Sequence, residues 1–371
     1  MIAPLLAAAA LAIAPTCDLE RPSGEPGCTR EAVDALPMNS LQAVGTHNSY
    51  KQAISGPEMA RLSLAAKATA LTLDYSHPGL TEQLDGGARQ LELDLLYDPE
   101  GGRYADPLGR KVAKLTGADL PPWDPAPMAR PGMKVLHVQD IDYRSSCPLF
   151  TDCLRAIADW SAAHPGHLPI LILINLKEDA IAFPGSVKPL PFDAAAMDAI
   201  DAEIRAVFAE DRLITPDQVQ GAFGSLRDAV RAGAWPVLAA ARGRVMFALD
   251  APPDQVARYR GDRAVLEGRA MFVNIEETSP AAGYITLNDP VGEAARIRAA
   301  TAAGLIVRTR ADADTAEART GDTARRDAAL ASAAQYVSTD YRTPDPRFTD
   351  YSVGLPGGVV GRAVEVVAPA D

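Results

Sequence analysis

The chain has 371 residues and a formal net charge of −12 at pH 7, from 36 Lys and Arg against 48 Asp and Glu. A surface of this sign repels phosphate backbones and anionic headgroups, which argues against generic nucleic-acid binding and polybasic membrane docking. With 47% hydrophobic and 23% charged residues, the composition is that of a globular protein. The length suits one large α/β barrel or two ordinary domains.

The first fourteen residues, MIAPLLAAAALAIA, are apolar and uncharged, and Ala12-Ile13-Ala14 offers a small-residue cleavage site. The run is shorter than the roughly 20 residues that span a bilayer. We therefore expect residues 1–14 to be a signal peptide and residues 15–371 to form one domain. The protein is expected to be exported, either to the periplasm or out of the cell.

The four cysteines fall into two local pairs, Cys17 with Cys28 and Cys147 with Cys153. An even, locally paired set is typical of disulfides in an exported protein. Each bridge would close a short loop and stabilise the fold by about 2–3 kcal/mol. The alternatives are four unrelated thiols or a zinc site, and zinc is disfavoured because no CxxC or closely spaced histidine accompanies them.

Short apolar runs alternate along the chain with Ala-rich segments of helical periodicity. Eight strands are predicted near residues 41–44, 90–96, 134–138, 170–176, 245–249, 270–275, 304–307 and 336–337. Helices are predicted at 153–164, 194–208, 218–232, 292–303 and 323–334, and long surface loops at 98–132 and 180–192. This alternation predicts an α/β fold, a single (β/α)8 barrel, with an open doubly wound sheet as the alternative.

Polar side chains follow almost every predicted strand, where a (β/α)8 barrel builds its active site. They are Thr46, His47, Asn48, Glu92, Asp94, His137, Asn175, Lys177, Asp250, Asn274, Glu276, Glu277, Arg308 and Asp340. The two cations Lys177 and Arg308 would suit an anionic phosphodiester substrate. Their alternative role is to neutralise carboxylates of the same set, such as Asp250.

Two carboxylates in the run RQLELDLL, Glu92 and Asp94, lie two residues apart, so a strand points both to the same face. Buried together, they need a cation or a proton. Oxygen ligands favour calcium or magnesium over zinc. A structural ion pair, for instance with Arg89, is an equally good interpretation of these two residues alone.

Two of the five histidines, His47 and His137, stand where predicted strands end and flank the strand that carries the carboxylates. Neutral imidazole can act as base and as acid in one turnover. For a lone histidine, structural hydrogen bonding is the alternative. His164 and His167 lie in a helix-to-strand loop at the opposite end and are expected to be structural, and His77 stays unassigned.

Five runs of the sequence resemble the bacterial calcium-dependent phosphoinositide-specific phospholipase C family over about residues 36–341. They are NSLQAVGTHNSYK, LDGGARQLELDLLYD, KVLHVQD, PILILINLKED and GLIVRTRADADTAEARTGDTARRDAALASAAQYVSTDY. The resemblance implies a (β/α)8 barrel that cleaves phosphatidylinositol-type lipids to diacylglycerol and a cyclic or open inositol phosphate. It implies that His47 activates the inositol 2-hydroxyl or steadies the phosphate, and that His137 protonates the leaving oxygen.

The resemblance also implies one bound Ca²⁺, with Mg²⁺ less favoured, and the ligands Asn48, Glu92 and Asp94. Relatives commonly present a glutamate in the fourth strand where this chain has Asn175. Asn175 can still coordinate through its carbonyl oxygen, but the site then carries two carboxylates unless Glu178 or Asp250 moves in. Fewer ligand charges mean weaker calcium binding.

Two other functions are considered. A glycerophosphodiester phosphodiesterase or another secreted phosphodiesterase would use direct water attack and form no cyclic product, although the former carries His-Arg-Gly where this chain has His47-Asn48-Ser49. A non-catalytic barrel that binds a headgroup is the other alternative, motivated by Asn175.

The expected partner is a phosphodiester lipid or its headgroup, with no nucleic acid, and the protein is expected to be a monomer. Transient membrane contact would use one of two loops. They are LPPWDPAPM, with Trp123, and SCPLFTDC, with Leu149 and Phe150.

Overall fold

The computed structural model describes residues 13–364 of the chain. The predicted leader, residues 1–14, therefore lies almost entirely outside the described residues and stays a prediction. Among the residues described, no helix combines the length and the apolar character needed to cross a bilayer.

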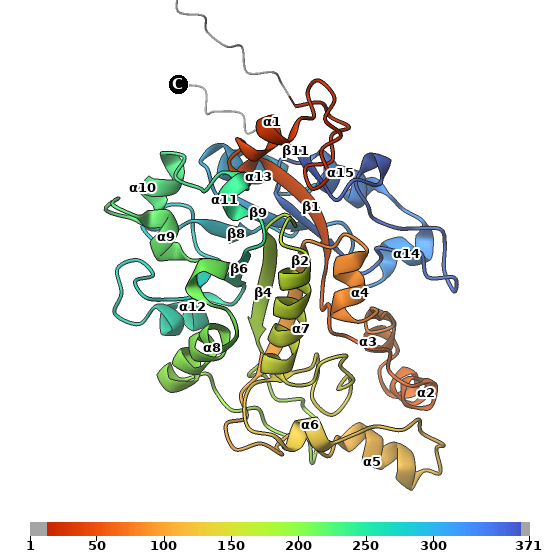
Figure 1. Cartoon of the computed structure of the whole chain (residues 1–371). Helices are drawn as coiled ribbons and strands as arrows, with labels where there is room; N and C mark the ends of the chain where they lie inside the picture. Colours follow the sequence, from red (N-terminus) through yellow and green to blue (C-terminus); the bar gives the residue numbers. More distant parts are fainter. Residues whose placement is uncertain (1–12, 365–371) are drawn as a thin grey trace, which may run out of the picture.

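Two sheets form the interior of the fold (Figure 1). The first has the order β11-β1-β10-β9-β8, with β1 at Leu41–Thr46, β8 at Tyr284–Thr286, β9 at Ile306–Arg310, β10 at Tyr336–Thr339 and β11 at Gly361–Ala363. The second has the order β3-β2-β4-β6-β5, with β2 at Gln90–Leu96, β3 at Lys134–Val135, β4 at Ile170–Leu176, β5 at Leu213–Ile214 and β6 at Val245–Leu249, and β7 at Met271–Val273 also pairs with β6. The strand pairs are parallel, except that β11 runs antiparallel to β1 and β3 antiparallel to β2.

The two sheets approach each other at both edges. A parallel bridge between Asn274 and Tyr284 joins the end of β7 to β8. At the other edge, the Arg89 amide donates to the Val44 carbonyl at 3.0 Å. A Cβ atom at Gly45 would lie 2.2 Å from the Gln90 carbonyl oxygen, so β1 can approach β2 this closely only because residue 45 is glycine.

Helices follow the strands and cover the sheets. They are α1 Arg30–Asp34, α2 Gly56–Ala65, α3 Lys67–Thr72, α4 Leu80–Asp85, α5 Leu108–Leu115, α6 Ala126–Ala129, α7 Phe150–Ala163, α8 Ala194–Val207, α9 Pro216–Gln220, α10 Leu226–Arg231, α11 Leu238–Ala241, α12 Pro253–Arg260, α13 Ala294–Ala302, α14 Ala316–Thr320 and α15 Ala324–Ala331. In Figure 1, α2, α5 and α6 lie at one end of the molecule, and α1 and α11 lie at the other. Because α2 follows β1 and α5 follows β2, the first end is the one at which the parallel strands finish.

The alternating pattern of β2 divides its side chains between two environments. Leu91, Leu93 and Leu95 belong to the main hydrophobic core, whereas Glu92 and Asp94 point to the opposite face of the strand. The neighbouring β4 is buried along its length apart from the half-buried Asn175 in its sequence ILILINL. A continuous apolar sequence of this kind is typical of a strand that is buried on both faces.

The mixed α/β class predicted from the sequence is confirmed, and three local predictions are wrong. Residues 134–138 do not form a parallel strand, because only Lys134–Val135 pairs, antiparallel to β2, before a tight turn bridged at Val138 and Asp142. Two parallel strands were not predicted, β5 and β8, because they are only two and three residues long and have no extended apolar run to indicate them.

Two other segments differ from expectation. Residues 98–132 contain the helices α5 and α6 rather than loop alone. The predicted helix at 218–232 is broken into α9 and α10, because Gly221 ends the first helix with a φ of 52°. Both predicted disulfides, Cys17–Cys28 and Cys147–Cys153, are confirmed.

Gly45→Ala should destabilise the protein by about 3 kcal/mol, because the new methyl group would meet the Gln90 backbone and separate β1 from β2. Urea unfolding followed by circular dichroism measures the change. Gly56→Ala is the matched control, since a Cβ there meets nothing within 4 Å, and it should change stability by less than about 1 kcal/mol. Equal effects of the two substitutions would contradict the assignment of Gly45 to a close strand contact.

Candidate functional site

The chain turns sharply where β1 ends, at Thr46. The His47 amide donates to the Thr339 carbonyl of β10 at 3.1 Å, and the next residue, Asn48, has a φ of 47°. Asparagine tolerates this left-handed conformation better than most residues. The turn is also fixed by His77, whose Nε2 donates to the His47 carbonyl at 2.8 Å. The unassigned histidine of the sequence thus supports the main chain of the site.

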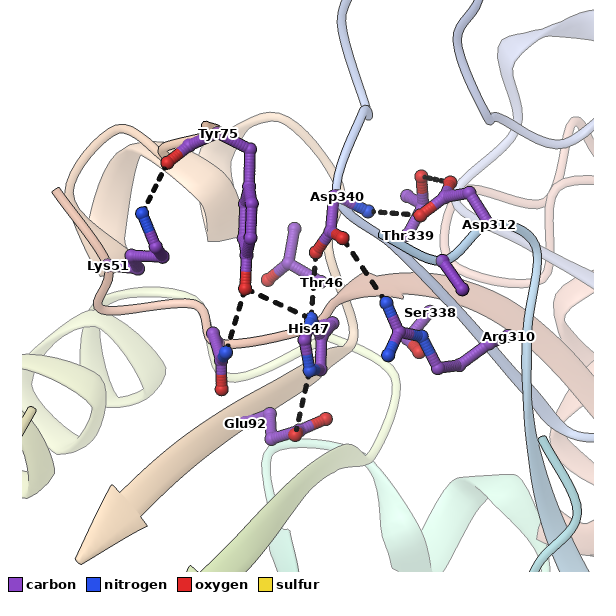
Figure 2. Close-up of polar contacts among 12 residues, drawn as sticks. Thr46, His47, Lys51, Tyr75, Glu92, Arg310, Asp312, Ser338, Thr339 and Asp340 are labelled. Atoms are coloured by element: carbon purple, nitrogen blue, oxygen red, sulfur yellow. Dashed lines mark hydrogen bonds and ion pairs between the residues drawn. The ribbon is translucent and has the colours of Figure 1, made fainter. Parts of the chain in front are cut away.

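The His47 side chain lies between two carboxylates (Figure 2). Its Nδ1 is 2.8 Å from Oδ1 of Asp340, and its Nε2 is 3.7 Å from Oε1 of Glu92. A carboxylate accepts the proton on Nδ1, so the unprotonated Nε2 faces Glu92. Arg310 approaches the second oxygen of Asp340 at 3.2 Å.

Burial and the nearby Arg310 charge lower the pKa of His47 from 6.5 to about 3, so its imidazole is neutral at pH 7. Burial alone would raise the pKa of Asp340, but contact with His47 and Arg310 outweighs it and holds that pKa well below its usual range. Behind this pair, Asp312 accepts a hydrogen bond from the Asp340 amide at 2.8 Å and another from the Thr339 hydroxyl. Burial and the Asp340 charge raise the pKa of Asp312 to about 7.

The second predicted histidine, His137, has a carboxylate partner of its own. Its Nδ1 lies 2.8 Å from Oδ2 of Asp142, a residue in the turn that follows β3. Asp142 is fully buried, and its charge is met by the Lys51 ammonium at 3.3 Å. Each histidine therefore has Nδ1 held by a buried carboxylate, which leaves Nε2 as the reactive nitrogen.

Lys51 connects the surroundings of the two histidines. Its ammonium is fully buried and donates to the carbonyl oxygens of Leu73 at 2.9 Å and Tyr75 at 2.6 Å, besides contacting Asp142. The Tyr75 hydroxyl lies 3.3 Å from His47 Nδ1 (Figure 2) and accepts a hydrogen bond from the Asn48 amide at 2.8 Å. A change at Lys51 therefore reaches both histidines.

The carboxylate of Glu92 is held by side chains from the adjacent strand β4 and from β9 of the other sheet. Its Oε2 accepts a hydrogen bond from Arg308 of β9 at 2.6 Å, and its Oε1 accepts one from the Asn175 amide of β4 at 2.8 Å. Burial raises the pKa of Glu92 to about 7 even though Arg308 opposes the shift. The alternative partner Arg89 is excluded, because its guanidinium pairs with Glu20 at the other end of β2.

Neither Asp94 oxygen receives a hydrogen bond of good geometry, although the Lys177 ammonium is 2.8 Å from Oδ2 and the buried Tyr50 hydroxyl also faces this carboxylate. The carbonyl oxygen of the Asn48 side chain is also buried without a donor. Buried acceptors left without donors are costly. A hard cation that binds oxygen atoms would satisfy both residues.

The predicted ligand set therefore fits calcium in its chemistry. It consists of oxygen atoms from Asn48, Glu92 and Asp94, with Asn175 adjacent to Glu92 and in register with Asp94. No cluster of three His, Cys, Asp or Glu residues arranged for a metal occurs within residues 13–364, so amide oxygens would have to complete the set.

The two acids considered as replacements for the missing glutamate are engaged elsewhere. Glu178 forms a two-pronged pair with Arg258 at 2.7 and 2.8 Å. Asp250 accepts a hydrogen bond from Asn274 at 2.9 Å. The adjacent acids Glu276 and Glu277 both contact Arg296 and belong to the surface.

The other predicted site residues take the roles that the sequence left open. Lys177 and Arg308 contact the carboxylates Asp94 and Glu92, as their alternative interpretation predicted, and a role in substrate binding stays a prediction. His167 bonds the Ser161 hydroxyl at 2.7 Å, and His164 contacts the Trp160 carbonyl, in agreement with structural roles.

Sequence reasoning missed four residues that hold the histidines: Lys51, Tyr75, Asp142 and Arg310. Arg310 could have been found, because it lies two residues after Arg308 and so shares its face of β9. Asp142 could have been noticed five residues after His137. Lys51 and Tyr75 lie in loops, where no periodicity gives a signal.

Fold and site together define an α/β protein whose histidines, carboxylates and side-chain amides gather where its parallel strands end. A family model described as "Phosphoinositide phospholipase C, Ca²⁺-dependent" matches residues 36–364. The chain belongs to this family, and the resemblance seen in its sequence is thereby confirmed. No curated protein sequence matches the chain.

Solved structures of similar fold include two from bacteria. A calcium-dependent phosphoinositol-specific phospholipase C from Pseudomonas sp., described as an apo form and myoinositol complex, has 16% identity and a TM-score of 0.54, covering 89% of this chain and 96% of that chain. A Ca²⁺-dependent phosphatidylinositol-specific phospholipase C from Streptomyces antibioticus has 19% identity and a TM-score of 0.50, covering 82% of this chain and 95% of that chain. At these identities the similarity establishes the fold alone.

Lys51→Met should destabilise the protein by about 3–5 kcal/mol, because it leaves the Asp142 carboxylate buried and unpaired. Urea unfolding at pH 7 measures the loss. Lys188→Met, at an exposed lysine, is the control and should stay within about 0.5 kcal/mol of the parent protein. An unchanged midpoint for Lys51→Met would show that the buried ion pair does not stabilise the site.

Proposed function

We propose that this protein is a calcium-dependent phosphodiesterase that cleaves phosphatidylinositol-type lipids to diacylglycerol and an inositol phosphate. The observation that carries the proposal is the pair of histidines whose Nδ1 atoms are held by buried carboxylates, beside acceptor oxygens that lack donors. This combination provides a base, an acid and a cation site, which together suit the transfer of a phosphoryl group. Family membership supports the same reaction class.

In the proposed reaction, His47 is the general base. Its Nε2 faces Glu92 and the interior, so it can accept the proton of the inositol 2-hydroxyl. Asp340 stabilises the imidazolium that forms, and Arg310 fixes Asp340. Proton transfer by a positioned group of this kind contributes about 10²- to 10⁴-fold to the rate.

His137 is the proposed general acid. Its partner Asp142 holds the ring by Nδ1, so Nε2 is the nitrogen from which, in the imidazolium form, a proton would pass to the departing diacylglycerol oxygen. Attack by the 2-hydroxyl gives a cyclic phosphodiester. Water then opens this product when the two histidines exchange roles, with His137 as base and His47 as acid.

Calcium would be held by Asn48, Glu92 and Asp94, with Asn175 assisting. When bound, it neutralises charge on the phosphate and lowers the pKa of the attacking hydroxyl. The cations Lys177 and Arg308 already compensate Asp94 and Glu92, so this site starts with less free negative charge than three carboxylates would give. We therefore expect weaker calcium binding than a site with glutamate at position 175 would have.

A role in substrate binding is proposed for Lys177, Arg308 and Asp250. Lys177 is one-third exposed and can meet a phosphate oxygen, whereas Arg308 is buried and acts through Glu92. Burial is the main cause of the raised pKa of Glu92; the charge of Asp250 raises this pKa further, whereas Arg308 lowers it. Asp250 can also accept a hydrogen bond from a sugar hydroxyl.

Three architectural statements accompany this function as proposals. The contacts at both sheet edges support closure of the two sheets into one (β/α)8 barrel, formed as a single domain. The two disulfides support export to an oxidising compartment. The protein is proposed to act as a monomer.

Asp94→Asn should lower calcium-dependent lipid cleavage by at least about 100-fold, because it removes one of two carboxylate ligands. Calcium titration calorimetry on the same variant should show a weakened or lost binding isotherm. Asp262→Asn, at an exposed position, is the control and should keep the parent calcium response. Full activity of Asp94→Asn, insensitive to chelator, would contradict the metal assignment.

His47→Gln and His137→Gln should each lower kcat by about 10²- to 10⁴-fold, while His164→Gln at the opposite end should not. A substrate with a weakly basic phenolate leaving group separates the two roles. It should restore most activity to His137→Gln, because that leaving group needs no proton, and little to His47→Gln. The reverse pattern would mean that the two roles are exchanged.

Phosphorus NMR of phosphatidylinositol turnover distinguishes the alternative phosphodiesterase mechanism. The proposed reaction gives a cyclic phosphate signal that decays to the open inositol phosphate. Direct formation of the open product, without the cyclic signal, would favour water attack as in glycerophosphodiester phosphodiesterases.

A further inference from the structure

Exposed apolar side chains gather at the end of the molecule that carries the candidate site. Leu64 of α2 is 90% exposed, Leu115 of α5 is 87% exposed, and Phe183 in the loop 181–186 is 57% exposed. Val112 of α5 is also exposed. Side chains of this kind are singly unremarkable on a surface, but a contiguous group indicates an interaction site.

The loops that the sequence suggested for membrane contact do not supply such a surface. Leu149 and Phe150 are buried. Trp123 packs edge-on against Tyr143, with 5.2 Å between ring centroids. The exposed apolar groups belong instead to α2 and α5, neither of which was predicted from the sequence, and to the loop 181–186.

A groove of about 530 Å³ runs between these elements, within the size range of pockets that bind small ligands. Its lining is mostly apolar and includes Ile54, Leu62, Leu108, Val112, Ile141 and Phe183. The helices on its two sides are joined by Arg61 of α2, whose Nε donates to Thr116, just past α5, at 2.8 Å. Figure 1 shows α2 and α5 close to each other at this end.

The groove is attached to the loop that carries His137. Asp140, which lines it, lies between His137 and Asp142, and its carboxylate accepts hydrogen bonds from the amides of Leu108 and Val187, both at 2.7 Å. Its carbonyl accepts the Gly109 amide at 2.9 Å. The groove and the candidate site are thus parts of one hydrogen-bonded structure.

Helix α5 combines apolar and cationic faces. Leu108, Val112 and Leu115 recur at helical spacing, and the remaining positions include Arg110, Lys111 and Lys114 with no acidic residue. Lys111 has an exposed partner in Asp106, a type of pair that contributes little. A cationic helix is therefore present although the net charge of the chain is −12. The net charge alone argued against docking to an anionic membrane, and this helix removes that objection for its own part of the surface.

We propose that α2, α5 and the loop 181–186 form a docking surface for an anionic lipid bilayer, with one lipid chain in the groove. This surface is defined by Leu64, Val112, Leu115, Phe183, Arg110, Lys111 and Lys114. The proposal rests on the proposed function, because it names the surface that brings the lipid headgroup to His47 and His137. Apolar side chains flanked by Lys and Arg are typical of helices that lie in the membrane interface.

The charge pattern favours a bilayer over a second copy of the chain. An isologous dimer through this surface would bring the cations of α5 against the same cations of the partner, which is unfavourable. An anionic bilayer instead attracts them, at about 1 kcal/mol for each Lys or Arg near the surface.

The test uses the full chain and vesicles without phosphoinositide, so that binding is separated from catalysis. Sedimentation with phosphatidylcholine vesicles containing phosphatidylglycerol should show binding that falls at least tenfold in Leu64→Glu/Leu115→Glu. Neutralising Arg110, Lys111 and Lys114 to Gln should remove the preference for phosphatidylglycerol. Val237→Glu, at an exposed apolar residue beside α11 at the other end, is the control and should bind as the parent does.

Turnover of a short-chain, monomeric phosphatidylinositol should be unchanged in Leu64→Glu/Leu115→Glu, which also shows that the variant is folded. Absence of vesicle binding by the parent, equal binding by the variant, or conversion of a parent dimer to a monomer by the variant would each overturn the proposal. Vesicle binding without turnover of any phosphodiester would instead refute the proposed function and keep the docking surface.

Discussion

A buried ion pair between Glu92 of β2 and Arg308 of β9 joins the two sheets across the interior, and much of the site depends on it. The carboxylate and guanidinium are almost fully buried and lie 2.6 Å apart. Removing one member of such a pair typically costs about 3–5 kcal/mol, because the other charge stays buried. Glu92 also receives the Asn175 amide and faces Nε2 of His47, so this ion pair aligns groups from three strands.

The other buried charges at the strand ends also have partners of opposite charge or hydrogen-bond partners. Asp340 is matched by His47 and Arg310, Asp142 is matched by Lys51, and Asp94 is matched by Lys177. The interior is thus polar but compensated in charge. The lack of well-oriented donors at Asp94 and at the Asn48 amide oxygen, beside Glu92, is the observation that supports the proposed calcium site.

Sequence reasoning located most of these groups because β2 and β4 are long, apolar and periodic, so their ends can be found. The positions of His47, Glu92, Asp94 and Asn175 followed from that pattern. Prediction from the sequence failed where the structure depends on contacts between residues that are distant in the chain. The three-residue β8 is defined by its neighbours, and the buried ion pair of Lys51 with Asp142 joins two loops that are distant in the chain. Loop residues such as Tyr75 carry no periodic signal at all.

Asp140 joins three segments of the chain by hydrogen bonds: the start of α5, the loop that carries His137 and the segment at Val187. Because its side chain and carbonyl together hold the start of α5, the strand-end loop and residue Val187, these segments form a stiff junction. Gly109 allows this junction to be tight, since a Cβ there would lie 2.4 Å from the Asp140 carbonyl oxygen. The start of α5 is therefore tied through Asp140 to the loop that carries His137, so a shift of this helix would strain the hydrogen bonds of that loop.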